Sequence, residues 1–309
     1  MSDRRSALAA LVTAGLLWGL TVPLSKLALE WLDPAGLTVV RFSFAALPLA
    51  LLTRRGLRRA FSLPVVAWGA GGYGLVIIVQ NLGIGQTSVS HAALIVGAAP
   101  VLVALLNAAL GRGTSGLVAW TGFGLALAGV ALVAGGGGDD ATLEGDLFVL
   151  LSVAGSAAFI VAQPRLLAGR DPASVTAVQL GAGAVIALPI ALAFEGLPSS
   201  LPGTTPLAAA FALAFAGTLL PFVLFALGQA RVTPELAGAF VNLEPLVGGA
   251  VGALAFHDAF GGLQLLGATA ILAGIALSAA PRRTRPGTTV GGRDGGRGRT
   301  RPPRTARHV

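Results

Sequence analysis

The chain has little charge and no cysteine. Asp, Glu, Lys and Arg make up 11% of its 309 residues, whereas a soluble domain carries about 25%. Without cysteine there is no disulfide, no thiolate nucleophile and no cysteine metal site. Hydrophobic residues form 54% of the chain and the mean hydropathy is +0.80. So much apolar surface excludes soluble enzymes, nucleic-acid-binding proteins and fibrous proteins, and predicts an all-α polytopic membrane protein.

The uncharged runs have the length of membrane spans. A spanning helix needs about 20 mostly apolar residues. Residues 60–111 contain no Asp, Glu, Lys or Arg, and the polar Gln86-Thr87-Ser88 segment divides this run into two spans. The chain then predicts ten transmembrane helices, at about 6–25, 35–53, 63–83, 91–110, 117–134, 146–164, 174–194, 206–228, 234–255 and 262–280.

Charge alternates in sign between successive loops. Basic residues gather in short cytoplasmic loops, and the 20 arginines against a single lysine are typical of a high-GC bacterial genome. We therefore predict a bacterial plasma-membrane protein with both termini in the cytoplasm. The inner segments hold Arg4, Arg5, Arg54, Arg55, Arg58, Arg59, Arg112, Arg165, Arg170, Arg231 and nine arginines after residue 281, and the outer segments hold Glu30, Asp33, Asp139, Asp140, Glu144, Asp146, Glu195 and Asp258.

The two ends of the chain differ in composition. Residues 1–25 begin with basic residues and continue with an apolar run, as a secretory signal does. The run is long and lacks a clear small-residue cleavage site, so we expect it to remain as the first span. Residues 282–309 are rich in Arg, Gly, Thr and Pro, and we expect a disordered basic cytoplasmic tail near anionic lipid rather than an RNA-binding tract.

The chain also repeats itself. Residues 33–41, Asp-Pro-Ala-Gly-Leu-Thr-Val-Val-Arg, align with residues 171–179, Asp-Pro-Ala-Ser-Val-Thr-Ala-Val-Gln, at an offset of 138. At an offset of 145, Leu82-Gly83, Pro100, Gly122 and Gly129 match Leu227-Gly228, Pro245, Gly267 and Gly274. These matches predict one five-helix repeat over 1–138 and a second over 139–281. Because five is odd, the second repeat enters the membrane from the opposite side, and such inverted repeats are common in secondary transporters.

Several short motifs stand in an order that resembles the EamA-type family of the drug/metabolite transporter superfamily. They are Trp18-Gly19, Pro23 and Lys26 in the first span, Arg41-Phe42 in the second, Pro100 and Pro245 in the fourth and ninth, and the glycine pairs Gly122/Gly129 and Gly267/Gly274. The resemblance covers about residues 6–280. It implies ten helices around a central cavity lined mainly by spans 1, 3, 4, 6, 8 and 9, and transport, often export, of amino acids or related metabolites. The family often carries Glu near the ends of spans four and nine, where this chain reads Gly111-Arg112-Gly113 and His257-Asp258.

Glu244 is the charged residue that we place deepest in the membrane. It lies about ten residues into the predicted ninth span, which is about 15 Å at 1.5 Å per residue. A charge at this depth is costly and needs a reason. Either Glu244 couples transport to protons or binds a cation beside the substrate, or it forms an ion pair with Lys26 or Arg41.

Lys26 and Arg41 occupy the outer halves of the first and second spans. We favour side chains that extend to the outer surface or pair with Glu30 and Asp33 over direct binding of a substrate carboxylate. Pro245 and Pro100 remove backbone hydrogen bonds, so we expect each to bend its helix.

The remaining polar and aromatic residues are candidates for cavity walls. We assign Trp18, Tyr73, Gln80, Asn81, Gln163, Phe222 and Asn242 to the substrate cavity, while Asn107 and Gln179 are expected to join helices by hydrogen bonds. For Trp18, packing in the core is an equal alternative, and Phe222 with Phe225 fits simple packing as well.

The sequence contains no motif for catalysis, for a cofactor or for a metal. The three histidines have no ligand spacing, and no phosphate-binding loop with Lys is present. We therefore expect a secondary active transporter that exports small metabolites by alternating access, with proton coupling as a hypothesis, and not an enzyme. Its partners are a small-molecule substrate and the lipid bilayer, with no nucleic acid; a homodimer is compatible with the chain. A lipid or lipid-precursor flippase and a non-transporting membrane scaffold remain as alternatives.

Overall fold

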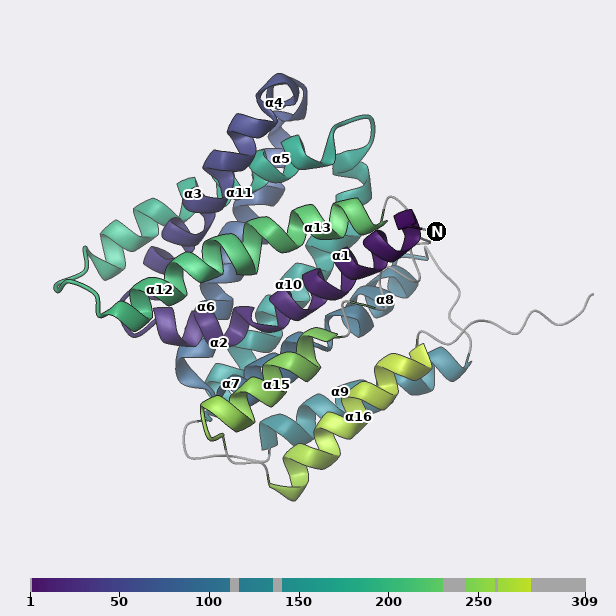
Figure 1. The fold of residues 1–309 in the computed structure, drawn as a ribbon. Coiled ribbons are helices and arrows are strands. Elements are labelled where there is room, and N and C mark those ends of the chain that lie inside the picture. The colour runs from purple at the N-terminus through teal and green to yellow at the C-terminus, as the bar shows by residue number, and fades with distance from the viewer. Residues whose placement is uncertain are drawn as a thin grey trace, which may run out of the picture.

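The computed structural model describes residues 2–111, 117–135, 141–229, 240, 243–258 and 261–278, and its regular elements are helices (Figure 1). The first half contains α1 (Ser2–Gly19), α2 (Thr21–Ala28), α3 (Pro34–Leu52), α4 (Arg54–Ala60), α5 (Leu63–Trp68), η1 (Gly69–Leu75), α6 (Val76–Gln86), α7 (Val89–Val96), α8 (Ala99–Ala109) and α9 (Leu117–Gly135). The second half contains α10 (Leu143–Leu167), α11 (Pro172–Ile190), η2 (Ala191–Glu195), α12 (Thr204–Ala214), η3 (Phe215–Leu219), α13 (Leu220–Gln229), α15 (Leu243–Ala255) and α16 (Gly262–Ser278).

Most of these helices are long and apolar enough to cross a bilayer. Seven continuous helical stretches meet that condition, and three shorter apolar helices lie at 120–134, 243–255 and 262–274. The protein is therefore a multi-pass membrane protein. The expected break at Gln86-Thr87-Ser88 is confirmed, because α6 ends at Gln86 and α7 begins at Val89. The ninth predicted span is described at residue 240 and from Leu243 onward, so most of its beginning, with Asn242, lies outside the described residues.

Several spans are interrupted where single helices were expected. The first span is split at Leu20 into α1 and α2, because Pro23 has no N–H to bond the carbonyl of Gly19. The third and eighth spans each contain a wide π-type turn, η1 and η3. The predicted inner loop after α3 forms the short helix α4, which carries four arginines.

The two corners that begin with Asp-Pro-Ala lie at opposite ends of the bundle. Helix α3 starts beside the end of η2, because the backbone N–H groups of Ala35 and Gly36 each donate 2.8 Å hydrogen bonds to Glu195. It ends beside the start of α11, where Gly56 packs against Ser174. Since α3 and α11 run antiparallel along each other, the Asp33 and Asp171 corners are about 28 Å apart at 1.5 Å per residue. We call these two sides the Asp33 end and the Asp171 end.

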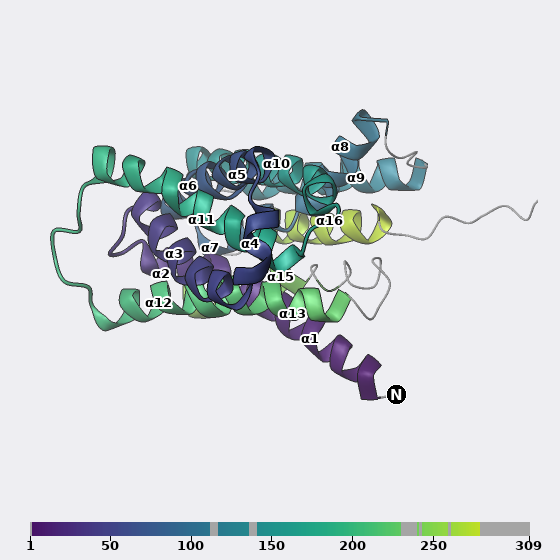
Figure 2. The same ribbon diagram turned by 90° about the horizontal axis from the view of Figure 1, so that it is seen from above.

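Helices α9 and α16 form a closely packed pair at one side of the bundle in both views (Figures 1 and 2). A Cβ atom added at Gly129 would lie 2.6 Å from the Gly267 carbonyl oxygen, and one added at Gly267 would lie 2.7 Å from that of Gly129. A Cβ atom added at Gly274 would likewise lie 2.5 Å from the Gly122 carbonyl oxygen. Small residues that let backbones approach are the usual basis of helix packing in lipid.

The glycine contacts give a first prediction. Gly129→Ala should lower the free energy of unfolding by about 1–3 kcal/mol, because the new methyl group meets backbone atoms that cannot rotate away. Gly124→Ala on the same helix is the matched control, since nothing lies within 4 Å of its added Cβ, and it should change stability by less than about 0.5 kcal/mol. Unfolding followed by circular dichroism in mixed micelles measures both. Equal losses in the two variants would contradict the close contact of α9 with α16.

Candidate functional site

Arg41 is buried in the middle of α3, with 8% of its surface exposed. Its Nε donates a 2.7 Å hydrogen bond to the hydroxyl of Thr218 in η3, and that hydroxyl donates to the Leu213 carbonyl at 2.9 Å. The guanidinium carbon lies 5.6 Å from the ring centre of Phe42. The expectation that the side chain reaches the outer surface, or pairs with Glu30 or Asp33, is therefore wrong. The Arg41 side chain lies inside the bundle, where it donates to Thr218.

Much of the hydrogen-bonding capacity of Arg41 stays unused. A guanidinium has five N–H donors, and Thr218 takes the one on Nε. Within the described chain, no residue accepts a hydrogen bond from the two terminal nitrogens, and neither is among the enclosed polar atoms that lack a partner. In the residues that the structure describes, these donors are therefore free to bind an anionic group.

Aromatic rings from four separate helical elements gather beside this arginine. The ring of Trp18 lies 5.5 Å from that of Phe222 and 5.1 Å from that of Phe225. Tyr73 in η1 lies 6.1 Å from Phe222 and 4.7 Å from Phe159 of α10. The structure brings Trp18, Tyr73 and Phe222 together as one aromatic wall, which suits an apolar or aromatic group.

Glu244, near the start of α15, completes the charged groups of this region. A Cβ atom added at Gly19 would lie 3.1 Å from the Glu244 carbonyl, so α15 packs directly on the end of α1. The carboxylate is partly buried and interacts electrostatically with Arg41. Among the described residues no ion pair within 4.0 Å joins the two. The two opposite charges are therefore near enough to interact, but they form no ion pair in the described residues.

The Asp33 end is held together by polar contacts. Lys26 donates to the carbonyl oxygens of Ile84, Gly85 and Thr87 at 3.0, 3.1 and 2.8 Å. This ties α2 to the corner between α6 and α7, a role that none of the readings of Lys26 from the sequence included. Glu195 adds its two bonds to the start of α3 at the same end.

A second polar group at this end surrounds Asp146. One carboxylate oxygen of Asp146 accepts a 2.5 Å hydrogen bond from Thr87, and the other lies 3.0 Å from Nδ1 of His91. Asp146 and His91 are both almost fully buried. Nearby, Asp258 accepts a 2.6 Å bond from the Ser90 backbone N–H. Sequence reasoning counted Asp146 and Glu195 only as loop charges, and it also named Asp258 at the place where the family often carries Glu. Their position at span ends, next to polar turns, was the available signal for these contacts.

Other residues predicted for the cavity hold helices together instead. Gln163 and Gln179 exchange two amide hydrogen bonds, at 3.0 and 2.9 Å, between α10 and α11. Asn81 is fully buried and donates to the Pro34 carbonyl and the Thr38 hydroxyl, both at 3.2 Å. The Asn81 amide thus bonds the second span and not, as we expected, a substrate. Among the described residues, its side-chain oxygen has no hydrogen-bond partner.

The remaining predicted positions are placed as follows. Gln80 is partly buried on α6, and Asn242 lies outside the described residues. Pro100 lies next to the start of α8, where α7 has ended at Val96, and Pro245 packs against Gly97 at that break. In the part of the chain that the structure describes, no group of three or more His, Asp or Glu residues could hold a metal.

The chain is similar to known proteins along most of its length. The EamA-like transporter family matches the chain twice, over residues 5–135 and 143–280. The protein belongs to this family. A protein of Streptantibioticus cattleyicolor named "Probable terminal-alkyne amino-acid exporter" is 30% identical over 279 residues, which cover 87% of this chain and 91% of that protein.

Further relatives agree with membership in this family. The "Uncharacterized transporter YdfC" of Bacillus subtilis is 30% identical over 156 residues, covering 49% of this chain and 51% of its own. A crystal structure that is 23% identical in sequence superposes with a TM-score of 0.65 over 89% of this chain and 96% of that chain, and so shares the fold. The EamA-like protein is therefore a membrane protein that is homologous to transporters.

The buried Asp146 group gives a second prediction. Asp146→Asn should lower the free energy of unfolding by about 1–3 kcal/mol, because Thr87 and His91 lose a charged acceptor in a buried place. Glu144→Gln, an exposed carboxylate in the same helical turn, should stay within about 0.5 kcal/mol of the wild type. Denaturant titration in detergent compares the two variants. An unchanged Asp146→Asn protein would show that these contacts do not hold the Asp33 end.

Proposed function

We propose that this EamA-like protein is a secondary active transporter that exports amino acids or closely related small metabolites by alternating access. One observation carries the proposal: Arg41 is buried beside an aromatic wall and near the opposite charge of Glu244, and in the described residues its terminal nitrogens have no acceptor. A zwitterion with an apolar side chain fits such a site. Its carboxylate would bind the free guanidinium nitrogens, and its ammonium group would lie toward Glu244.

Each contact has a physical reason. Guanidinium groups bind carboxylates through paired, charge-assisted hydrogen bonds. An ammonium group or a proton neutralises a carboxylate that is otherwise costly inside a membrane. The ring faces of Trp18 and Phe222 attract both aliphatic and cationic groups. The printed name of the Streptantibioticus relative, an amino-acid exporter, supports this substrate class.

Alternating access is supported by the internal repetition of the chain. We propose that residues 1–138 and 139–281 are inverted five-helix repeats with ten spans in all. The family matches each half separately, and α3 packs antiparallel on its counterpart α11. The Gly129–Gly267 contact and the Gly122–Gly274 contact exchange with each other under the offset of 145, as a two-fold axis in the membrane plane requires. Such symmetry makes inward-open and outward-open states near equivalents.

The orientation of the transport cycle follows from charge. The Asp171 end carries the α4 arginines, so we place it in the cytoplasm of a bacterial plasma membrane. The Asp33 end, where Lys26, Glu195 and Asp146 make their polar contacts, is then the outer gate. Export requires these contacts to break as the inner end closes.

Arg41 provides the third prediction, which tests the site. In proteoliposomes loaded with a labelled amino-acid mixture, Arg41→Gln should reduce transport by about tenfold or more, since a hydrogen bond to a charged group contributes about 1.5–3 kcal/mol. Arg41→Lys keeps the charge without the paired geometry and should give an intermediate rate. Arg165→Gln, at an exposed position of α10, should transport normally. Wild-type rates in a folded Arg41→Gln protein would rule out carboxylate binding there.

Glu244 provides the fourth prediction, which tests proton coupling. When the lumen of the liposomes is made acidic, wild-type protein should accumulate substrate as protons leave. Glu244→Gln should lose about tenfold or more of this gradient-driven accumulation, because it cannot exchange a proton with substrate. It should still exchange labelled for unlabelled substrate across equal pH.

The two readouts separate coupling from folding. Loss of both accumulation and exchange in Glu244→Gln would show that the charge of Glu244 is needed to bind the substrate ammonium group or to support the fold, and that its role is not limited to proton exchange. If wild-type transport ignored the pH gradient altogether, the proton hypothesis would be wrong while the transporter assignment would stand.

A further inference from the structure

The junction between α3 and α4 joins strongly apolar to strongly basic surface. Leu51 and Leu52 end α3 with 73% and 79% of their surfaces exposed. Arg54 and Arg55 follow after a single residue and are also exposed. In a membrane protein this sequence of side chains marks the boundary between acyl chains and headgroups, because leucine favours the hydrocarbon and arginine the charged interface.

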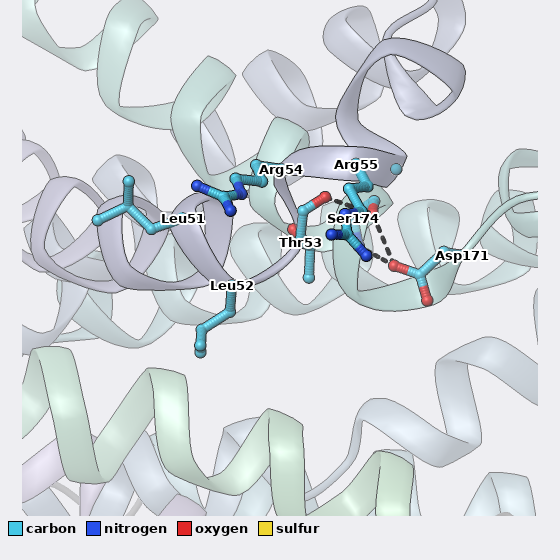
Figure 3. Close-up of a pocket in the computed structure, with 8 residues that line it drawn as sticks. Leu51, Leu52, Thr53, Arg54, Arg55, Asp171 and Ser174 are labelled. Carbon is cyan, nitrogen blue, oxygen red and sulfur yellow. Dashed lines mark hydrogen bonds between the residues drawn. The ribbon is translucent and has the colours of Figure 1, made fainter.

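A pocket of about 610 Å³ lies at this junction (Figure 3). Its lining comes from the end of α3, the start of α4 and the start of α11. Leu51 and Leu52 lie on one side of the pocket and Asp171 with Ser174 on the other, with Arg54 and Arg55 between them. The pocket is therefore basic at its centre and apolar at one edge.

The backbone of the pocket is held in place by contacts between α4 and α11. A Cβ atom added at Gly56 would collide with the Ser174 hydroxyl, so α4 approaches α11 as closely as glycine allows. The Ser174 backbone N–H and hydroxyl donate to Oδ2 of Asp171 at 2.8 and 2.6 Å. Oδ2 of Asp171 thus already accepts two hydrogen bonds at the start of α11, where the helix dipole favours a negative charge.

Among the residues that the structure describes, Arg54 and Arg55 have no acidic partner. In the described chain no carboxylate lies within 4.0 Å of the guanidinium group of Arg54 or Arg55. Arg58 and Arg59, on the same short helix, are exposed as well. With four arginines near one aspartate whose oxygen is already bonded, the pocket attracts anions.

We propose that this pocket binds the headgroup of an anionic phospholipid. Arginine pairs bind phosphate through forked, charge-assisted hydrogen bonds, which accounts for Arg54 and Arg55. The exposed Leu51 and Leu52 beside them offer an apolar surface that the acyl chains of a lipid can cover. A free phosphate ion has no acyl chains and would leave this surface bare. Anionic lipids are abundant in the cytoplasmic leaflet, and basic residues next to a span attract them. The lipid would lie against α3 and α11, so its phosphate bridges the two helices at the Asp171 end.

The experiment measures lipid retention by native mass spectrometry in an uncharged detergent. The full chain is titrated with phosphatidylglycerol and, separately, with phosphatidylcholine. Wild-type protein should retain one phosphatidylglycerol about tenfold better than phosphatidylcholine, and Arg54→Gln/Arg55→Gln should abolish that preference. Arg58→Gln/Arg59→Gln removes the same charge outside the pocket lining and should change retention by less than about threefold.

Three further outcomes decide between the explanations. Arg54→Lys/Arg55→Lys keeps the charge and should retain part of the preference, which separates loss of binding from loss of folding. Equal weakening in the two Gln variants would mean diffuse attraction by α4 and would overturn the pocket. Displacement of the lipid by millimolar inorganic phosphate, with no effect of acyl chains, would assign the pocket to a free anion and also overturn the proposal.

Discussion

A buried arginine that is only partly satisfied is the constraint on which the proposed site depends. Arg41 is kept inside the bundle by one hydrogen bond to Thr218, a ring contact with Phe42 and the distant charge of Glu244. A cation in this position is costly in a membrane unless it is paired. In the described residues its terminal nitrogens have no acceptor, so an anionic substrate group would supply what the fold leaves open. The Glu244 carboxylate is likewise costly in a membrane without a partner, and a cationic substrate group or a proton would neutralise it.

The wide turn at η3 makes this arrangement possible. The Thr218 hydroxyl bonds the carbonyl of Leu213, five residues earlier, and at the same time accepts from Arg41. Such π-type turns leave backbone groups to be satisfied by side chains and often occur at functional sites. The corresponding turn η1 carries Tyr73 to the aromatic wall. Both turns come from the third helix of each half, so the proposed repeat symmetry extends to the site itself.

Close backbone packing explains how so apolar a chain holds a defined shape in lipid. The bilayer provides little hydrophobic drive between helices. Glycine contacts, as between α9 and α16, and polar contacts at the Asp33 end therefore determine which helices meet. The two differ in one respect that matters for transport: glycine contacts are made of rigid backbone, whereas Lys26, Glu195 and Asp146 act through side chains that can exchange partners. The second kind suits a gate that opens and closes.

Composition and order along the chain determined the membrane class, most span boundaries and the family, because hydropathy, loop charge and motif spacing are properties of the linear sequence. They also indicated Trp18, Tyr73 and Phe222 as candidates for cavity walls, but not that these three rings lie together. Only the tertiary structure decided the partners of individual side chains. Arg41 turned inward to Thr218, Lys26 bound three carbonyls, and Gln163 and Asn81 joined helices, because these outcomes depend on how each helix is rotated about its axis. In a helix that is apolar on every side, no amphipathic stripe records that rotation, so the sequence leaves it undetermined.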